Sequence, residues 1–164
     1  MKKIIGILML LAIIVTACGC QNNHYGIVPF ENKNVMMECN INGKFDVIIK
    51  KENDTLSLEV VKPSEIEGLA FVFSKEESYA LSDEMQIPIS KESYKGIFAI
   101  VSILNIKEEM SLSATSSGGN GIVEFLCDTG KYTFIYDNDG YLVGATVISD
   151  NYRYNIVING LKIL

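Results

Sequence analysis

Cysteine, histidine and paired acidic residues are the side chains of this sequence that could carry out chemistry. The chain contains four cysteines but only one histidine, His24. A nucleophilic cysteine normally needs a histidine base beside it, and one histidine cannot form a histidine-rich metal site. The acidic pairs Glu76-Glu77, Asp83-Glu84 and Glu108-Glu109 lie at the ends of predicted elements, where carboxylates are usually solvated. The sequence therefore favours a protein that is not an enzyme and holds no metal or cofactor.

Two glycine-containing segments have the composition of ion-binding loops but not the spacing. Asp137-Asn138-Asp139-Gly140 begins like a calcium-binding loop, yet the position where that loop needs a glutamate is Ile148. The segment from Gly118 to Gly121 is rich in glycine, but no Lys-Ser or Lys-Thr follows it as in a phosphate-binding loop. Both segments are predicted to be turns, and neither is expected to bind a ligand.

The first residues combine a basic start with a hydrophobic segment. Lys2 and Lys3 precede an almost unbroken apolar run from Ile4 to Val15, which has the length of a signal-peptide core and is short for a membrane span. The run ends in Val15-Thr16-Ala17-Cys18, an aliphatic residue and two small residues before a cysteine. Small side chains such as those of Thr16 and Ala17 allow a protease that cleaves a signal peptide to approach the backbone closely.

This segment resembles the lipobox of bacterial lipoproteins. The resemblance implies that the Cys18 thiol receives a diacylglyceryl group, and that a signal peptidase cleaves between Ala17 and Cys18. Residues 1–17 would then be a lipoprotein signal peptide. The acyl chains, such as palmitate, would anchor the mature protein at the extracytoplasmic face of the cell membrane. An ordinary secretory leader that happens to contain a cysteine, or an uncleaved anchor, is the alternative.

The residues after the leader divide into a tether and a domain. Residues 18–34 are polar, rich in asparagine and without hydrophobic periodicity, so we expect a tether between the lipid and the folded part. The periodic pattern begins at Val35, and residues 35–164 are predicted to form one domain.

Three thiols would remain after lipidation: Cys20, Cys39 and Cys127. An odd number excludes a complete disulfide framework. Cys39 and Cys127 both fall among apolar neighbours in predicted strands. Buried free thiols are one interpretation, and a bridge between Cys39 and Cys127 is the other.

The charge of the chain argues against a nucleic-acid partner. Asp and Glu number 20 against 14 Lys and Arg, which gives a formal net charge of −6. Nucleic-acid binding depends on neutralising phosphates with basic residues, so an acidic protein is poorly suited to it.

Period-two alternation of apolar residues dominates the chain from Val35 onward and predicts β-strands. Asn42-Gly43 lies between two such runs and is a strong hairpin signal, because both central residues of a type I′ turn need positive φ. Short turns recur to the end of the chain. We therefore expect nine to eleven strands in a mainly antiparallel, meandering sheet.

One segment, Lys91 to Asn105, has helical periodicity, and Ser90 is a candidate N-terminal cap. The segment is apolar on nearly all faces, so it must be enclosed on more than one side. A wide flat sheet would expose a larger apolar face than soluble proteins tolerate. Both requirements are met if the sheet curves around the helix, which predicts a mainly β, α+β half-barrel wrapped over one main helix.

This order of elements resembles the LolA-like half-barrel lipoproteins and carriers. The resemblance rests on the segment from Leu58 to Phe71, with Pro63 followed by Ile66-Glu67-Gly68-Leu69, and on Tyr132 to Asp137 before a glycine turn. It implies a hydrophobic cavity under the sheet. Aromatic and aliphatic residues of the strands and helix are candidates for contacting a ligand there, with plain core as the simpler interpretation: Phe71, Phe73, Ile97, Phe98, Val101, Tyr132 and Phe134.

Two functions therefore remain open on the sequence alone. The first is a membrane-anchored, non-enzymatic lipoprotein of the cell envelope that binds a lipid or other hydrophobic small molecule under the sheet. The second is a protein-interaction module of the envelope with a solid core and no ligand.

Overall fold

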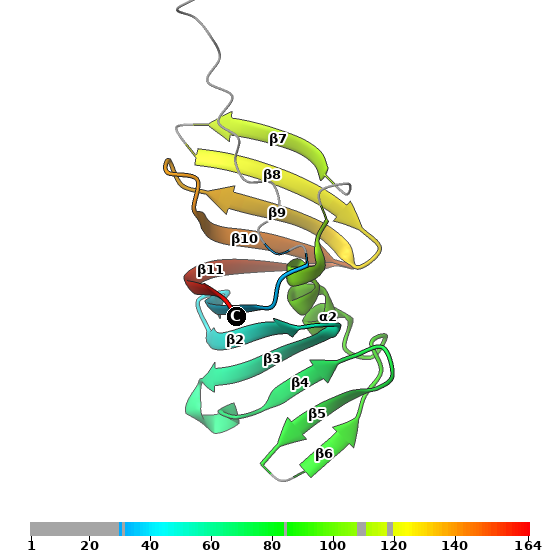
Figure 1. Ribbon diagram of the computed structural model, residues 1–164. Coiled ribbons are helices and arrows are strands. Elements are labelled where there is room, and N and C mark those ends of the chain that lie inside the picture. The colour runs from blue at the N-terminus through cyan, green and yellow to red at the C-terminus, as the bar shows by residue number, and fades with distance from the viewer. Residues whose placement is uncertain (1–29, 31, 84, 108–110, 118–119) are drawn as a thin grey trace, which may run out of the picture.

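The described strands form one antiparallel sheet of eleven strands in the order β6-β5-β4-β3-β2-β1-β11-β10-β9-β8-β7. A computed structural model describes residues 30, 32–83, 85–107, 111–117 and 120–164. Figure 1 shows the sheet bending around the helix α2, with β7–β10 above it and β2–β6 below it. The predicted fold class, a mainly β curved antiparallel sheet over one helix, is confirmed.

The first half of the sheet is a meander of six strands, each paired with the next along the chain. Asn42 and Gly43 have φ of 55° and 70°, which confirms the predicted hairpin turn between the first two strands. The strands of this half are β1 (Val35–Ile41), β2 (Phe45–Glu52), β3 (Thr55–Lys62), β4 (Ala70–Phe73), β5 (Ser78–Ser82) and β6 (Met85–Pro88). A 3-10 helix, η1 (Ser64–Ile66), interrupts the connection from β3 to β4.

The second half is a meander of five strands, and the Asp137–Gly140 segment is the hairpin loop that the sequence predicts. The carboxylate of Asp137 accepts hydrogen bonds from the backbone N–H groups of Asp139 (3.0 Å) and Tyr141 (2.8 Å), so it closes the turn rather than offering a cation site. The strands are β7 (Ser111–Ser117), β8 (Asn120–Cys127), β9 (Gly130–Tyr136), β10 (Leu142–Ser149) and β11 (Tyr152–Ile163).

Pairing of β1 with β11 joins the two halves, from Val35 opposite Ile163 to Ile41 opposite Ile156. A register shift between Glu38 and Cys39 increases the local twist of this central pair. The chain passes from the first half to the second between β6 and β7, the two outermost strands of the sheet. That connection contains the helix and crosses the inner face.

The helix is shorter than the sequence predicts. It comprises α2 (Lys95–Val101) followed directly by the 3-10 helix η2 (Ser102–Asn105), whereas the predicted start was Lys91. Ser90 caps a preceding turn instead, because its hydroxyl accepts the Ser93 N–H (3.0 Å) and its carbonyl accepts the Tyr94 N–H (3.2 Å). Within the described residues, no helix is both long enough and apolar enough to cross a membrane.

The apolar enclosure predicted for the helix is present. α2 contacts both β3 and β10, which lie on opposite sides of the central strand pair. Val101, Ile103 and Leu104 are completely buried, and Ala99 and Ile100 nearly so. Curvature of the sheet is what brings strands from both halves onto this one short helix (Figure 1).

Phe30 belongs to the folded body, although the sequence places it in the tether. Its side chain is fully buried and its ring packs edge-on against Phe134, with centroids 6.4 Å apart. The Lys51 ammonium group donates hydrogen bonds to the carbonyl oxygens of Phe30 (3.3 Å) and Leu104 (3.2 Å). The folded body therefore includes Phe30, ahead of β1. A single aromatic residue without periodic neighbours gave no signal of this burial.

Several predictions about the N-terminal part concern residues outside the described ones. These are the signal peptide over residues 1–17, the cleavage site at Ala17 and Cys18, the lipidation of Cys18, and the tether before Phe30. Of the described cysteines, Cys39 is buried and Cys127 half-buried, and no disulfide joins the two. The predicted alternative of a bridge between Cys39 and Cys127 is therefore wrong.

Candidate functional site

An apolar cavity of about 270 Å³ lies between α2 and the first half of the sheet. Its floor consists of inward-facing side chains of four adjacent strands: Ile41, Val47, Leu58, Val60 and Phe71. The register explains their shared face, because Val47 lies opposite Val60 and Leu58 lies opposite Phe71. Side chains of directly opposed residues point to the same side of a sheet. The alternate apolar residues of these strands therefore form one continuous apolar surface, which is the floor of the cavity.

The roof of the cavity comes from the helix. Ile97 and Ile100 line it from α2, one turn apart on the face that points to the sheet. Just before α2, the ring of Tyr94 packs against that of Phe71 with centroids 5.6 Å apart. The start of the helix is therefore held against the floor, while a space remains further along.

The mouth is formed by the connection between β3 and β4. Ile66 and Leu69 line the cavity there, with Phe45 of β2 beside them. The connection is closed by hydrogen bonds from the Gly68 N–H to the Val60 carbonyl and from the Val60 N–H to the Leu69 carbonyl, both 2.9 Å. Phe45 and Ile66 are each 37% exposed, so apolar surface continues from the cavity to the solvent. The Ile-Glu-Gly-Leu segment that carries the family resemblance is thus the rim of the cavity.

Tyr154 of β11 forms the end wall, and Gly96 of α2 makes room for it. A side chain at position 96 would meet the Tyr154 hydroxyl group and the ring carbon that carries it. Asn42, the other polar residue of the lining, has its side-chain oxygen occupied by the Asn155 N–H at 2.8 Å. The interior therefore offers carbon surface almost throughout.

Only some of the ligand residues that the sequence suggests lie at the cavity. Phe71 and Ile97 line the cavity. Phe73 and Phe98 instead pack on each other, with ring centroids 5.2 Å apart. The other three are completely buried away from the cavity: Val101, Tyr132 and Phe134. Sequence reasoning missed most of the floor, although the alternation of Val47, Leu58 and Val60 already placed those residues on the inner face.

Aromatic residues fill the second half of the inner face. Phe134 packs against Phe125 at 5.1 Å and Tyr136 at 6.5 Å between ring centroids, in addition to Phe30. The Tyr132 hydroxyl donates a hydrogen bond to the Ala99 carbonyl of α2 (3.0 Å), and burial raises the pKa of Tyr132 to about 12. The aromatic stripe of β9 is thus solid core, and the apolar space lies on the other side of the helix.

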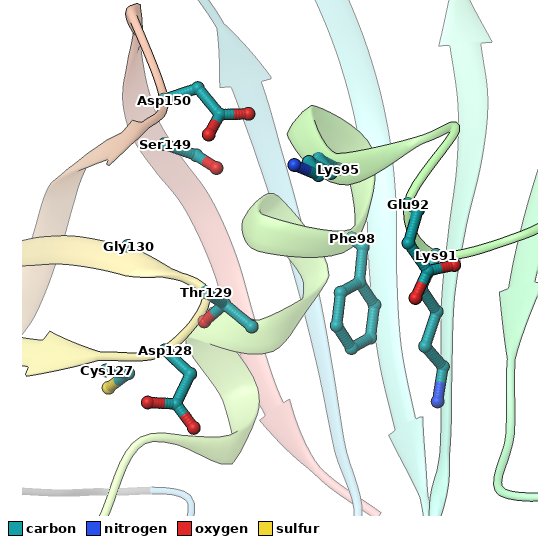
Figure 2. Close-up of a pocket in the computed structure, with 10 residues that line it drawn as sticks. All are labelled: Lys91, Glu92, Lys95, Phe98, Cys127, Asp128, Thr129, Gly130, Ser149 and Asp150. Atoms are coloured by element: carbon teal, nitrogen blue, oxygen red, sulfur yellow. The ribbon is translucent and has the colours of Figure 1, made fainter.

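A polar recess of about 370 Å³ lies beside the helix, between the β8–β9 and β10–β11 turns (Figure 2). Cys127 borders it, but burial raises the pKa of that thiol, with a smaller contribution from Asp128. Burial, with Asp46 as the smaller cause, raises the pKa of the Cys39 thiol to about 12. Neither thiol is activated as a nucleophile, since activation requires a lowered pKa. No group of three or more metal-ligating side chains occurs among the described residues.

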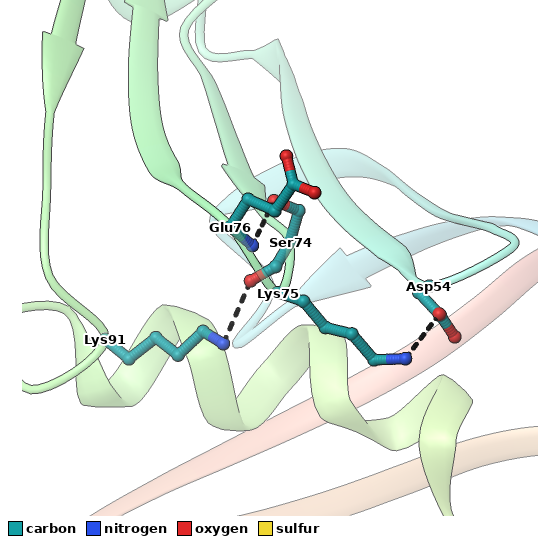
Figure 3. Close-up of polar contacts among 5 residues, drawn as sticks. All are labelled: Asp54, Ser74, Lys75, Glu76 and Lys91. Atoms are coloured by element: carbon teal, nitrogen blue, oxygen red, sulfur yellow. Dashed lines mark hydrogen bonds and ion pairs between the residues drawn. The ribbon is translucent and has the colours of Figure 1, made fainter.

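Polar contacts fix the turn that precedes α2 (Figure 3). The Lys91 ammonium group donates to the Ser74 carbonyl at 3.1 Å and lies 5.2 Å from the centroid of the Phe98 ring. Lys75 of the same β4–β5 turn forms an exposed ion pair, at 2.6 Å, with Asp54 of the β2–β3 turn. Exposed pairs of this kind contribute little to stability, whereas Lys91 ties the helix entry to the strands directly.

The sequence matches no protein-family model and no curated protein. Two solved structures are similar to it at low identity. An uncharacterized conserved protein from Thermus thermophilus is 7% identical, with a TM-score of 0.43 over 80% of this chain and 79% of the other. A LolA superfamily protein from Nitrosomonas europaea is 12% identical, with a TM-score of 0.40 over 85% of this chain and 90% of the other. The second has the family name that the sequence resemblance suggests. At these scores, membership of that family stays a prediction.

Replacing Gly96 with alanine tests whether Tyr154 closes the cavity against the helix. Alanine alone would stabilise a helix by up to about 1 kcal/mol, but here its methyl group meets the Tyr154 hydroxyl. We expect Gly96→Ala to give no gain in the free energy of unfolding while Tyr154 is present. The same substitution should give the gain in the Tyr154→Phe variant. A double-mutant cycle from urea unfolding should give a coupling of about 1 kcal/mol. Equal effects in both backgrounds would mean that the hydroxyl lies elsewhere.

Proposed function

We propose that this protein is a lipid-anchored, non-enzymatic protein of the extracytoplasmic membrane face that binds a hydrophobic ligand under its curved sheet. The cavity between α2 and strands β1–β4 carries the proposal. Its wall is apolar apart from Asn42 and the Tyr154 hydroxyl, and the Asn42 oxygen is already hydrogen-bonded to the protein. An apolar cavity with few polar groups is the usual form of a site for a hydrophobic ligand.

The size of the cavity suits one aliphatic chain. Its volume of about 270 Å³ is slightly below the roughly 300–1,000 Å³ that is typical of small-molecule sites, as expected for a ligand as slender as a single chain. The floor and roof are lined by branched aliphatic side chains and Phe71, which attract a chain by excluding water rather than by hydrogen bonds. Each methylene group that enters should add about 0.8 kcal/mol.

The mouth gives a chain a route into the cavity. Phe45 and Ile66 are partly exposed at the rim, so the end of an aliphatic chain meets apolar surface before it is enclosed. Leu69 continues that surface inward. The ligand's polar end would remain outside, because the interior offers almost no partner for it.

The anchor is supported by the leader sequence. Lys2, Lys3, the apolar run and Val15-Thr16-Ala17-Cys18 have the order of a lipoprotein signal. Two acyl chains on Cys18 would hold the protein stably on a membrane, where lipids and other amphiphiles are concentrated. An anchored protein with a cavity for one chain is suited to receive or carry such molecules.

Filling the cavity should abolish binding of a neutral aliphatic probe. Binding of 1-decanol is measured by titration calorimetry on the full chain carrying Cys18→Ala, so that no attached acyl group competes. We expect Val60→Phe, on the cavity floor, to weaken decanol binding at least about tenfold while thermal stability is kept, since substitutions that fill an apolar void commonly stabilise a protein. In the protein without Val60→Phe, decanol should bind on the order of tenfold tighter than 1-octanol, because two more methylene groups are buried.

Val157→Phe is the matched control, because Val157 is exposed on β11 and does not line the cavity. Val47→Leu is a smaller filling change for the case in which Val60→Phe does not fold. Decanol binding that is absent, or that is unchanged by both filling variants, would contradict the proposal and favour the protein-interaction module.

The lipid anchor is tested separately by metabolic labelling with radioactive palmitate in the native host. We expect labelled protein from the unaltered gene and none from Cys18→Ala, because the thiol is the acceptor of the lipid. Cys20→Ala serves as the control and should keep its label. Labelling that persists in Cys18→Ala would refute the lipobox assignment.

A further inference from the structure

A polar cavity of about 640 Å³ lies at the end of the central strand pair where β1 starts and β11 ends. Lys33 and Asn34 line it just before β1, Lys51 lines it from β2, and Lys107 lines it after η2. The Lys51 ammonium group reaches the Phe30 carbonyl at 3.3 Å, so the cavity borders the first residue that the structure describes. Three lysines therefore surround the place where the chain enters the folded body.

Positive charge prevails in this cavity, although the whole chain has a formal net charge of −6. Among the described residues that line it, Asp54 is the one with a carboxylate side chain. The hydrogen bond from Lys75 lowers the pKa of Asp54, and the charge of Lys51 makes a smaller contribution. The negative charge of Asp54 is thus already offset by basic groups of the protein.

Two more lysines lie on the outer face of the same end. Lys50 of β2 and Lys162 of β11 occupy the positions opposite Met36, one on each side of β1. Glu52, the last residue of β2, is an exposed carboxylate near them. Around the start of β1, lysines therefore outnumber carboxylates on both faces of the sheet.

Apolar side chains are exposed beside these lysines. β10 pairs with β11 only as far as Val157, so the last residues of β11 have a strand partner on the β1 side alone. Leu161, Ile163 and Leu164 are consequently exposed, and the Leu164 N–H donates to the carbonyl of Asn34, which lines the cavity. Exposed apolar side chains next to lysines are typical of a surface that rests on a membrane.

The chain that leads to the proposed anchor joins the domain at this same end. Cys18 is twelve residues ahead of Phe30, and that length of chain spans at most about 40 Å when fully extended. A lipid on Cys18 would therefore keep the start of β1 close to the bilayer. Phe45, at the mouth of the apolar cavity, lies at the other end of β2 from Lys51.

We propose that the end of the domain where β1 starts and β11 ends docks on a bilayer that contains anionic phospholipids. The lysines attract the lipid phosphates, and Ile163 with its apolar neighbours enters the interface between head groups and acyl chains. The inference rests on the lipid anchor of the proposed function, which holds the domain at the bilayer. Docking in this way turns Phe45 and the mouth of the apolar cavity away from the membrane, so a ligand would enter from the opposite side.

The test uses an introduced tryptophan, because the chain contains none and a single indole then reports on one position. The mature protein is purified from the native host and reconstituted through its own anchor into vesicles of brominated phospholipids, which quench a nearby indole. With about one third of the lipid as phosphatidylglycerol, Ile163→Trp fluorescence should fall about twofold or more, and in pure phosphatidylcholine it should fall far less.

Val157→Trp is the matched control, because Val157 and Ile163 lie on the same strand and are both 57% exposed. Val157 is paired with β10 and lies away from the end of β11. Its indole should therefore keep its fluorescence in both kinds of vesicle.

The charge dependence is tested in the Ile163→Trp protein. Replacing Lys33 and Lys162 together with glutamine should remove about half or more of the quenching in phosphatidylglycerol vesicles, because each lysine near an anionic surface strengthens binding. Replacing Lys44 and Lys95 together with glutamine changes the net charge equally and should leave the quenching as it is. Lys44 lies in the β1–β2 turn and Lys95 lies beside the β10–β11 turn, both away from the start of β1.

Palmitate labelling of the same preparations separates this inference from the anchor on which it rests. If the protein is labelled but Ile163→Trp is quenched no more than Val157→Trp, or is quenched equally in both kinds of vesicle, docking is overturned and the anchor stands. Equal losses of quenching in the two lysine pairs would also overturn it, since the effect would then be one of net charge. If the protein carries no label, the anchor fails and the inference fails with it.

Discussion

The constraint on which this structure depends is that the inner face of a single eleven-stranded sheet must be covered by one connection. The chain runs out along one meander from β1 to β6 and returns along another from β7 to β11. The connection between the outermost strands has to cross the concave side, and it carries α2 and η2. Burial of that apolar segment requires strands from both halves, so the sheet curves. The curvature is thus a consequence of topology and of the hydrophobic effect together.

A short crossing segment cannot fill both halves of the concave face equally. In the second half, Phe125, Phe134 and Tyr136 reach inward, and Phe30 adds a further ring from outside the strands. In the first half, the floor of the cavity consists of Ile41, Val47, Leu58 and Val60, with Phe71 as its one aromatic residue, and these side chains leave a space below the helix. The apolar space follows from this difference in side-chain size between the two halves. Tyr154 limits it at one end, where Gly96 allows the helix to approach β11 closely.

Much of the architecture follows from local sequence patterns, and the site follows only in part. Period-two alternation predicts the strands, and Asn42-Gly43 predicts its hairpin, because strand pleating and turn geometry are local properties. The helix entry at Lys95 was missed because Ser90 and Ser93 form a turn that resembles a helix cap. The burial of Phe30 depends on contacts with β9, which no local pattern encodes. The cavity likewise depends on which inner positions face a gap in three dimensions, so the large aromatic residues were favoured over Val47 and Val60.

The most direct test of the central claim is diffraction from crystals of the protein pressurised with xenon, which enters apolar voids without needing hydrogen bonds. The account predicts a xenon site between Leu58 and Phe71 of the floor and Ile97 of the helix, with the aromatic half around Phe134 unoccupied. A structure in which α2 has moved onto β3 and closed this space, with no xenon under the first half of the sheet, would contradict it.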